Sequence, residues 1–356
     1  MSEVSSNGSK SKKAQESGTE IGGDPILIEV TRGEMMESRH HATFAVSDSE
    51  GRIVLSAGEI ERPVYARSSL KPIQAIPLVE TGAAAAFGLG DAEIALACAS
   101  HNGEARHFNT VRAWLSKIGL SESDLECGPH LPYHEETAHD MIRRNEDPSQ
   151  LHNNCSGKHS GFLSVAKHLG YPTKGYIRLE HPVQQRILGL LETMTGLDLS
   201  NAPKGIDGCG IPVIGIPLGN LALAMARFAD PSDQPEARQD AIKRIRSAMA
   251  AEPFMVAGSG RYCTRVMAET KGRALIKAGA EGFFCGALPE LGLGIALKID
   301  DGATRAAENL MTRILHRLDV IDEETLAKVS APLTMPVRNR AGREIGLIRA
   351  PAHCPF

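Results

Sequence analysis

Ser68 and Lys71, in RSSLKP (residues 67–72), are the first two side chains whose types and spacing could do chemistry. A serine and a lysine three positions apart at the start of a helix lie on the same face, so we expect the hydroxyl and the amine to touch. Burial lowers a lysine pKa, and a neutral amine could take the serine proton as general base. The N–H groups at the helix start would favour an oxyanion. The alternative is an N-cap serine beside a solvated lysine.

Two further segments carry polar side chains where an apolar run ends or a strand is expected. Ser100, His101 and Asn102 lie in CASHNGE (98–104), where Ser100 could relay a proton and His101 could bond locally; the alternative is a cap for the helix that follows. Lys277 lies in the strand-like IKAGAEGFF (276–284), where its ammonium could bind a negative group or lower the pKa of a neighbouring lysine. The alternative for Lys277 is a solvent-facing strand lysine.

Two cysteines occur among small polar residues, Cys155 in NNCSGKHSGF (153–162) and Cys209 in GIDGCGIP (205–212). Two thiolates from such loops, together with either Lys158 or His159, could form an incomplete tetrahedral zinc site. The alternative is a pair of small buried thiols, which is the commoner fate of cysteine.

Composition limits the class of protein. The 356 residues suffice for one large domain or two, and 43 acidic against 39 basic side chains leave a net charge of −4, which disfavours nucleic-acid binding. The sequence has neither an apolar stretch long enough to cross a membrane nor an apolar signal core. Seven cysteines, an odd number without a C-x-x-C pair, indicate reduced thiols. We therefore predict a cytoplasmic protein without nucleic-acid or membrane partners.

The elements that must position these residues follow from periodicity. Residues 1–24 have little to bury and are predicted to form a disordered tail. Strands are predicted at 26–30, 42–47, 52–56, 274–279, 283–287, 293–299 and 344–349, and helices at 105–118, 158–169, 182–195, 236–250 and 303–318. The glycine-rich 205–219 is interpreted as a loop or hinge.

Strands near both chain ends and helices between them predict an α+β fold. We expect residues 25–356 to form a single catalytic unit, with an antiparallel sheet from about 25–67 and 270–356 and a helical region at about 68–269. A doubly wound α/β sheet is the second choice, disfavoured because the first three strands are linked too tightly for parallel crossovers.

The five motifs SSLKP, CASHNGE, NNCSGKHSGF, GIDGCGIP and KAGAEG, in this order, resemble the bacterial L-asparaginase family of the rhizobial inducible and constitutive type, over about residues 25–350. The resemblance implies a fold similar to serine β-lactamases and glutaminases, a homodimer, and hydrolysis of L-asparagine to L-aspartate and ammonia through an acyl-enzyme. Penicillin-recognising enzymes commonly carry Lys-Thr-Gly where this chain has Lys-Ala-Gly (277–279), which counts against β-lactamase activity. A glutaminase or other serine amidohydrolase of this fold, or a non-catalytic zinc-binding relative, stays open.

Site residues transfer from the resemblance by motif. It implies Ser68 as nucleophile, Lys71 as its base, Ser100 and Lys277 as the second Ser–Lys pair, and a zinc ion next to the active site. Because the serine route is complete without a metal, we expect that zinc does not generate the nucleophile and has a structural or substrate-orienting role. The implied zinc ligands are Cys155, Lys158 and Cys209. Asp207 is expected to bind the substrate's α-amino group, and the α-carboxylate is expected at Arg67, His101 and Asn102.

Overall fold

The computed structural model describes residues 23–329, 332–352 and 354. The predicted tail therefore lies outside the described residues, except for its last two positions. One of these, Asp24, is buried and accepts hydrogen bonds from Arg62 Nη2 at 2.7 Å and from the backbone N–H of Glu59 at 2.8 Å. The described fold thus makes tertiary contacts before its first strand begins.

An antiparallel sheet of eight strands forms the centre of the molecule, in the order β10-β11-β1-β2-β9-β8-β7, with β3 pairing β2. Its strands are β1 (Ile26–Arg32), β2 (Met35–Asp48), β3 (Ile53–Ala57), β7 (Leu275–Ala278), β8 (Phe283–Leu288), β9 (Leu293–Ile299), β10 (Met335–Arg338) and β11 (Glu344–Arg349). The long β2 pairs β1 along its first half and both β3 and β9 along its second half. The two chain ends thus build one antiparallel sheet, which confirms the α+β expectation and excludes a doubly wound sheet.

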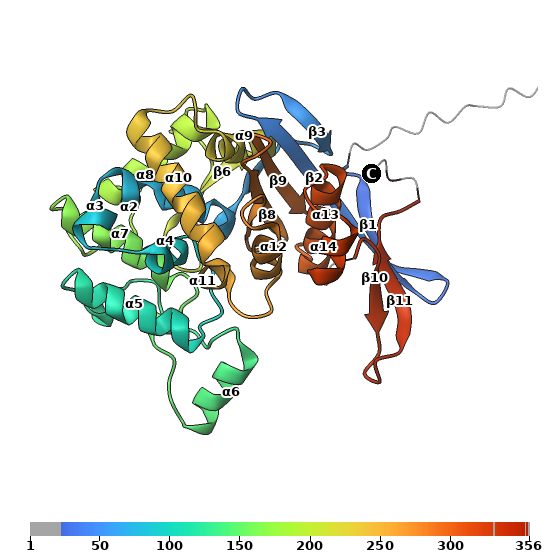
Figure 1. The fold of residues 1–356 in the computed structure, drawn as a ribbon, viewed down its shortest axis with the longest axis horizontal. Helices are drawn as coiled ribbons and strands as arrows, with labels where there is room; N and C mark the ends of the chain where they lie inside the picture. Colours follow the sequence, from blue (N-terminus) through green and yellow to red (C-terminus); the bar gives the residue numbers. More distant parts are fainter. Residues whose placement is uncertain (1–22, 330–331, 353, 355–356) are drawn as a thin grey trace, which may run out of the picture.

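Helices cover the sheet on both faces. Every residue of β8 is buried, as expected for a strand with packed layers on each side. Helices α9 (Leu218–Ala229) and α13 (Thr304–Arg317) both contact β8 and β9. Figure 1 shows most of the remaining helices gathered beside one end of the sheet, with the β10–β11 hairpin projecting at the other.

Between β3 and β7 the chain is mainly helical, with three short strands. Besides α9, the helical segments of this region are the 3₁₀ turns η1 (Arg67–Leu70), η2 (Glu122–Asp124) and η3 (Gln150–His152), and the helices α1 (Lys71–Gln74), α2 (Ile76–Glu80), α3 (Ala83–Ala86), α4 (Asp91–Ala97), α5 (Ala105–Lys117), α6 (Glu135–Arg143), α7 (Ser156–His168), α8 (Pro182–Thr195), α10 (Glu236–Ala251), α11 (Pro253–Ala257) and α12 (Tyr262–Thr270). A further short helix, α14 (Glu323–Lys328), follows α13.

The interpretation of residues 205–219 as a loop or hinge was wrong. A second sheet of three strands, in the order β4 (Pro63–Tyr65), β6 (Pro212–Pro217), β5 (Lys204–Ile206), includes most of this segment, and α9 begins at its end. The strands are too short, and too rich in glycine and proline, to give an alternating pattern, and pairing with β4 is a long-range contact that local sequence does not reveal. This small sheet carries the polypeptide on both sides of Asp207 and Cys209.

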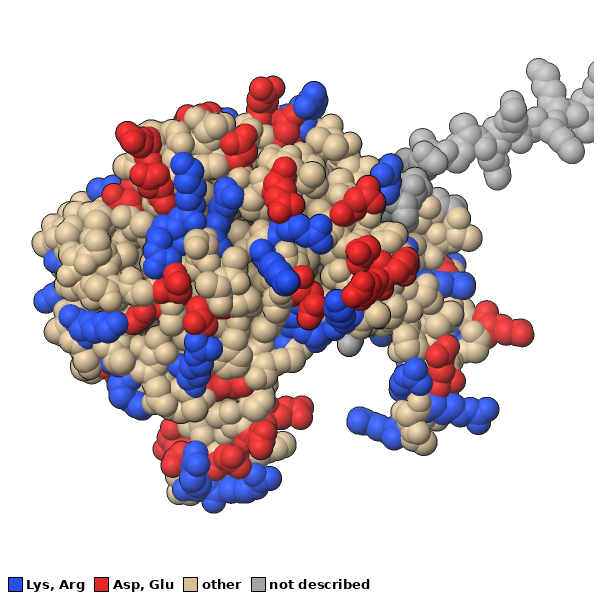
Figure 2. Space-filling model, viewed as in Figure 1, with Lys and Arg blue, Asp and Glu red and all other residues tan. Residues whose placement is uncertain are grey.

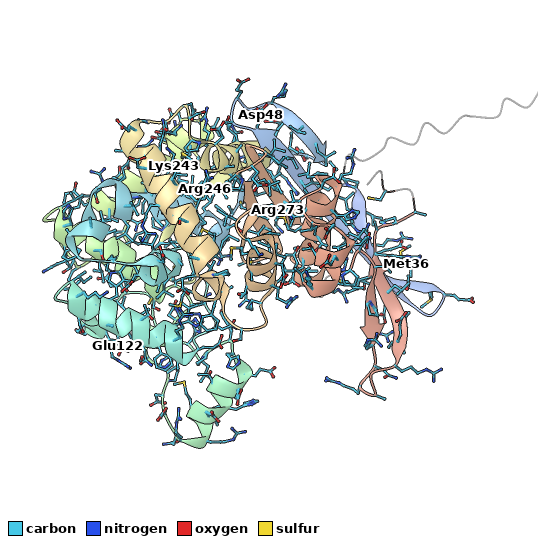
Figure 3. All side chains as sticks on the ribbon, in the orientation of Figure 1. Met36, Asp48, Glu122, Lys243, Arg246 and Arg273 are labelled. Carbon is cyan, nitrogen blue, oxygen red and sulfur yellow. The ribbon has the colours of Figure 1, made fainter. Side chains whose placement is uncertain are left out.

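Charges of both signs are interspersed over the face drawn in Figure 2, which is hollowed between the projecting α6 and the β10–β11 hairpin. Side chains fill the space between the helices and the sheet (Figure 3). Among the described helices, none has the length and apolar character needed to span a membrane.

Candidate active site

The hydroxyl of Ser100 lies between two buried lysine amines. Lys71 Nζ and Lys277 Nζ are each 2.9 Å from Ser100 Oγ, and both lysine side chains are 1% exposed. Lys71 comes from the start of α1, Ser100 from the loop after α4, and Lys277 from β7. Three segments far apart in the sequence therefore converge on one hydroxyl, as a general acid–base cluster requires.

Each lysine is held by a backbone carbonyl as well as by Ser100. Lys71 donates to Ala99 O at 2.5 Å and Lys277 donates to Ala278 O at 2.7 Å. Burial, followed by repulsion from Lys71, lowers the pKa of Lys277 to about 7, with Arg261 acting in the same direction and Cys263 and Cys155 opposing. Near neutral pH, Lys277 can therefore hold or release a proton.

Ser68 lines a cavity of about 440 Å³ that Ser100 also lines. The expected contact between Ser68 and Lys71 is not among the hydrogen bonds of the described residues, in which Lys71 instead reaches Ala99, Ser100 and Cys155. The Ser68 hydroxyl itself makes no hydrogen bond within the described part of the chain and is half-buried. Ser68 thus offers a hydroxyl to the cavity, whereas Ser100 contacts both lysines.

The backbone before Ser68 adopts an unusual conformation. Arg67 has φ +51°, in the left-handed region that non-glycine residues rarely adopt. The neighbouring Ser69 is fully buried and donates to Phe283 O at 3.4 Å, so it faces away from the cavity into the sheet. Strained backbone of this kind occurs often at functional sites, where packing holds it.

A second cluster of buried side chains joins the first through Lys71. Lys71 Nζ lies 3.0 Å from Cys155 Sγ, and Lys158 Nζ lies 2.9 Å from Cys209 Sγ. Both cysteines and Lys158 are at most 3% exposed. Cys155 precedes α7, where a Cβ on Gly157 would lie 2.2 Å from Leu96 O, so this glycine allows α7 to pack closely on α4.

The pKa values of the two thiol groups are shifted in opposite directions. The hydrogen bond with Cys209 is the largest cause that lowers the pKa of Cys155, and Lys71 and Lys158 add to it, while the same bond raises the pKa of Cys209. Burial opposes the charge on Lys158, but the two thiols outweigh it and raise the pKa of that lysine. These shifts favour a thiolate at Cys155 and an ammonium at Lys158.

Arg67 and Asp207 form a two-pronged ion pair. Arg67 Nε and Nη2 lie 3.0 and 3.2 Å from the Asp207 carboxylate oxygens. Burial opposes the charge on Asp207, yet its hydrogen bond with Arg67 and the nearby Lys158 lower its pKa. The guanidinium of Arg67 is thus already matched by a carboxylate, as in other Arg–carboxylate forks.

His101 and Asn102 hold the loop between α4 and α5. His101 is fully buried, accepts from the backbone N–H of Gly103 at 3.1 Å and lies 2.9 Å from Ser156 Oγ. Burial lowers the pKa of His101 well below its ordinary value, so the ring is neutral. Asn102 accepts from Arg261 Nη1 at 2.8 Å. Neither side chain lines the cavity, although both support residues around it.

Sequence reasoning missed several residues that line the cavity, chiefly Arg261, Tyr133 and Asn154. Arg261 precedes α12 and Tyr133 lies between η2 and α6, remote in sequence from the motifs at Ser68 and Ser100. The GSG turn before Arg261 was the sole local signal for that residue. Asn154 lies inside the NNCSGKHSGF motif, next to Cys155, but its residue type and spacing did not mark it as a site residue.

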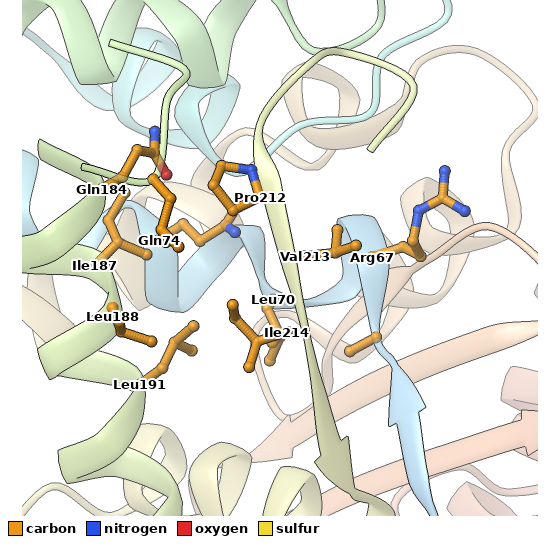
Figure 4. A pocket seen from close by; sticks show the side chains of 12 residues that line it. Arg67, Leu70, Gln74, Gln184, Ile187, Leu188, Leu191, Pro212, Val213 and Ile214 are labelled. Carbon is orange, nitrogen blue, oxygen red and sulfur yellow. The ribbon is translucent and has the colours of Figure 1, made fainter. Parts of the chain in front are cut away.

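A separate apolar cavity of about 30 Å³ lies behind the Ser68 segment. Its lining includes Leu70 and Ile214 with a row of apolar side chains from α8, and Figure 4 shows the Arg67 guanidinium directed away from them. The apolar α8 residues of this lining are Ile187, Leu188 and Leu191, and the polar Gln184 of the same helix lies beside them. This packing supports the turn η1 from behind and offers no reactive group.

Comparisons of the sequence and the structure with known proteins give three findings. The family model described as L-asparaginase II matches residues 28–350. No curated protein matches the chain. A solved structure described as "Crystal Structure Analysis of Mglu in its native form" is similar at 16% sequence identity and a TM-score of 0.44 over 80% of this chain. The chain spans 66% of the length of that protein.

Proposed function

Because this chain belongs to the L-asparaginase II family, we propose that it hydrolyses the side-chain amide of L-asparagine to L-aspartate and ammonia through a serine acyl-enzyme. One observation carries the mechanism: Ser100 Oγ lies 2.9 Å from each of two buried lysine amines, beside a cavity that Ser68 also lines. Such a cluster can move protons to and from an attacking or leaving group without a histidine.

In this proposal Ser68 attacks the amide carbon. Ser68 lines the cavity, and its hydroxyl makes no hydrogen bond to any residue that the structure describes, so a substrate can approach it. The Ser68 proton passes to the cluster of Ser100, Lys71 and Lys277, in which Lys277 is the lysine with the pKa of about 7. The same cluster returns a proton to the leaving ammonia, and water then hydrolyses the β-aspartyl ester.

Backbone N–H groups supply the oxyanion site in this scheme. Ser68 and Ala280 both line the cavity, and within the described residues the N–H of neither one makes a hydrogen bond. The first N–H groups of a helical turn have no partner inside the helix, which explains the free donor at Ser68. Two such donors stabilise the charge of a tetrahedral intermediate.

Zinc fits the thiol cluster, and we propose Cys155, Lys158 and Cys209 as its ligands. Two sulfurs and an amine within a buried cluster are a donor set that suits zinc, provided that Lys158 loses its proton. Among the described residues, no group of three or more His, Cys, Asp and Glu side chains could hold a metal, so the lysine is needed for a third ligand. Bound zinc, with its charge balanced by the two thiolates, would hold these three side chains in place next to Asp207, in a structural or substrate-orienting role.

Asp207 is proposed to receive the substrate's α-amino group, next to its partner Arg67. A fold related to serine β-lactamases and glutaminases, a homodimer and a cytoplasmic location, which suits seven free cysteines, complete the proposal. Light scattering of the purified protein tests the dimer.

Ammonia release from asparagine and from glutamine tests the function. We expect wild-type protein to prefer asparagine and Ser68→Ala to lose activity, whereas the matched control Ser69→Ala keeps it because Ser69 faces the sheet. Asparagine and glutamine differ by one methylene, which usually changes kcat/KM by only about 10- to 200-fold, so both amides must be measured. A preference for glutamine would favour the glutaminase alternative. An inactive wild type that binds zinc would favour the non-catalytic alternative.

A further inference from the structure

Arg261 brings a positive charge to the cavity that Ser68 and Ser100 line. The other lining residues are uncharged, being Ser68, Ser100, Tyr133, Asn154, Ala278, Gly279, Ala280 and Thr304. Arg261 is therefore the one charged side chain among the described residues of this lining. It lies directly before α12, where the chain leaves the cavity wall.

The loop that carries Arg261 is held in place from the Asn102 side. Asn102 accepts from Arg261 Nη1 at 2.8 Å and donates from Nδ2 to Ser259 O at 3.1 Å. The Glu104 carboxylate accepts from both the N–H and the hydroxyl of Ser259, each at 2.7 Å. Gly258 has φ +110°, and a Cβ there would lie 2.8 Å from Asn102 Cβ, so the loop can approach Asn102 this closely only with glycine.

Arg261 takes part in no ion pair among the described residues, and its one side-chain hydrogen-bond partner, Asn102, is neutral. The Glu308 carboxylate is near enough to feel the charge of Arg261, but the two side chains do not form an ion pair. By contrast, Arg67 is paired with Asp207 through two hydrogen bonds. A fixed guanidinium with unused donors at a cavity wall is suited to a carboxylate, which it can bind through two parallel hydrogen bonds.

We propose that Arg261 binds the α-carboxylate of the amino-acid substrate, with Asn102 as the residue that positions it. This inference rests on the proposed function. In it, Arg261 takes the place of Arg67 as the expected partner of the α-carboxylate. It limits good substrates to amides that carry a free carboxylate near the amide, because an amide without one leaves the guanidinium unpaired in the cavity.

The test compares L-asparagine with β-alaninamide, which is asparagine without its α-carboxylate. For Arg261→Gln we expect kcat/KM on asparagine to fall by about 10- to 150-fold, because this is the usual effect of losing a hydrogen bond to a charged group. The loss should lie mainly in KM, since the contact is the same in the ground and transition states. On β-alaninamide, Arg261→Gln should match the wild type within about threefold, and Arg261→Lys should restore part of the asparagine activity.

Arg305→Gln is the matched control, because it removes an exposed arginine beside Thr304 that does not line the cavity. We expect it to behave as wild type on both substrates, and thermal melting checks that all variants fold. If Arg261→Gln keeps the wild-type KM for asparagine, or if its kcat/KM falls equally on both substrates, Arg261 does not bind the α-carboxylate. Either result leaves the proposed hydrolase activity unaffected. A wild type that releases no ammonia from asparagine refutes the proposed function and this inference with it.

Discussion

Replacing Lys277 by arginine tests the proton path through Ser100. Lys277 Nζ lies 2.9 Å from Ser100 Oγ, and burial with repulsion from Lys71 lowers its pKa to about 7. Arginine keeps the positive charge but cannot lose its proton at the pH of an assay. If neutral Lys277 is the general base, Lys277→Arg should lose about 10²- to 10⁴-fold in kcat/KM.

The pKa of Lys277 sets how strongly the activity of the wild type should change with pH. The active form is the deprotonated one, so activity rises with pH: with a pKa of about 7, roughly a tenth of Lys277 is neutral at a pH of about 6 and about nine-tenths at a pH of about 8. We therefore expect kcat/KM, measured by ammonia release, to rise about tenfold over this range and then level off. His101 cannot cause this step, because burial lowers its pKa well below the ordinary value.

Two results would refute this reasoning. The first is a profile that stays flat from acid to alkaline pH, which would mean that no lysine must lose a proton. The second is a Lys277→Arg protein that folds like the wild type and keeps both its activity and the step in its profile. Circular dichroism and thermal melting of the variant distinguish misfolding from loss of the base.

Two other substitutions separate the proposed zinc site from the structural packing. Cys209→Ser should lower the zinc content of the purified protein, measured by elemental analysis. It should also raise the KM for asparagine more than it lowers kcat. Complete loss of turnover in a folded variant would contradict an orienting role for zinc. Leu191→Ala enlarges the apolar cavity behind η1 and should lower the free energy of unfolding, measured in urea, by about 2–5 kcal/mol. Its kcat/KM should stay within about threefold of the wild type. An unchanged free energy of unfolding would show that this leucine does not support the turn.

Local sequence patterns predicted the main elements where the signal was strong. Helix α8 matches its predicted bounds, because Pro182 begins it and Gly196, with φ +73°, ends it. Strand β9 matches its predicted bounds as well, through the alternation of Leu293, Ile295, Leu297 and Ile299. Helix α9 was not predicted, although its partly exposed residues lie on one side and its buried residues on the other, and β10 was missed because four residues give too short a pattern.

The site was predicted in its residues more than in its contacts. The motifs brought Ser100, Lys71 and Lys277 into one proposed mechanism, and the structure places both amines beside Ser100. The spacing argument paired Lys71 with Ser68, but Ser68 lies in a 3₁₀ turn and the Lys71 side chain extends to a different segment. Arg261 lies 159 positions from its partner Asn102, so no local pattern joins them.

The central claim, that Ser68 forms a covalent ester with the substrate, can be measured directly. Enzyme mixed with L-asparagine, quenched in acid during the first turnovers and digested, should yield a β-aspartyl adduct on the peptide that contains Ser68, and Ser68→Ala should yield none. An adduct on the peptide of Ser100 instead, or rapid turnover without any adduct, would contradict the account.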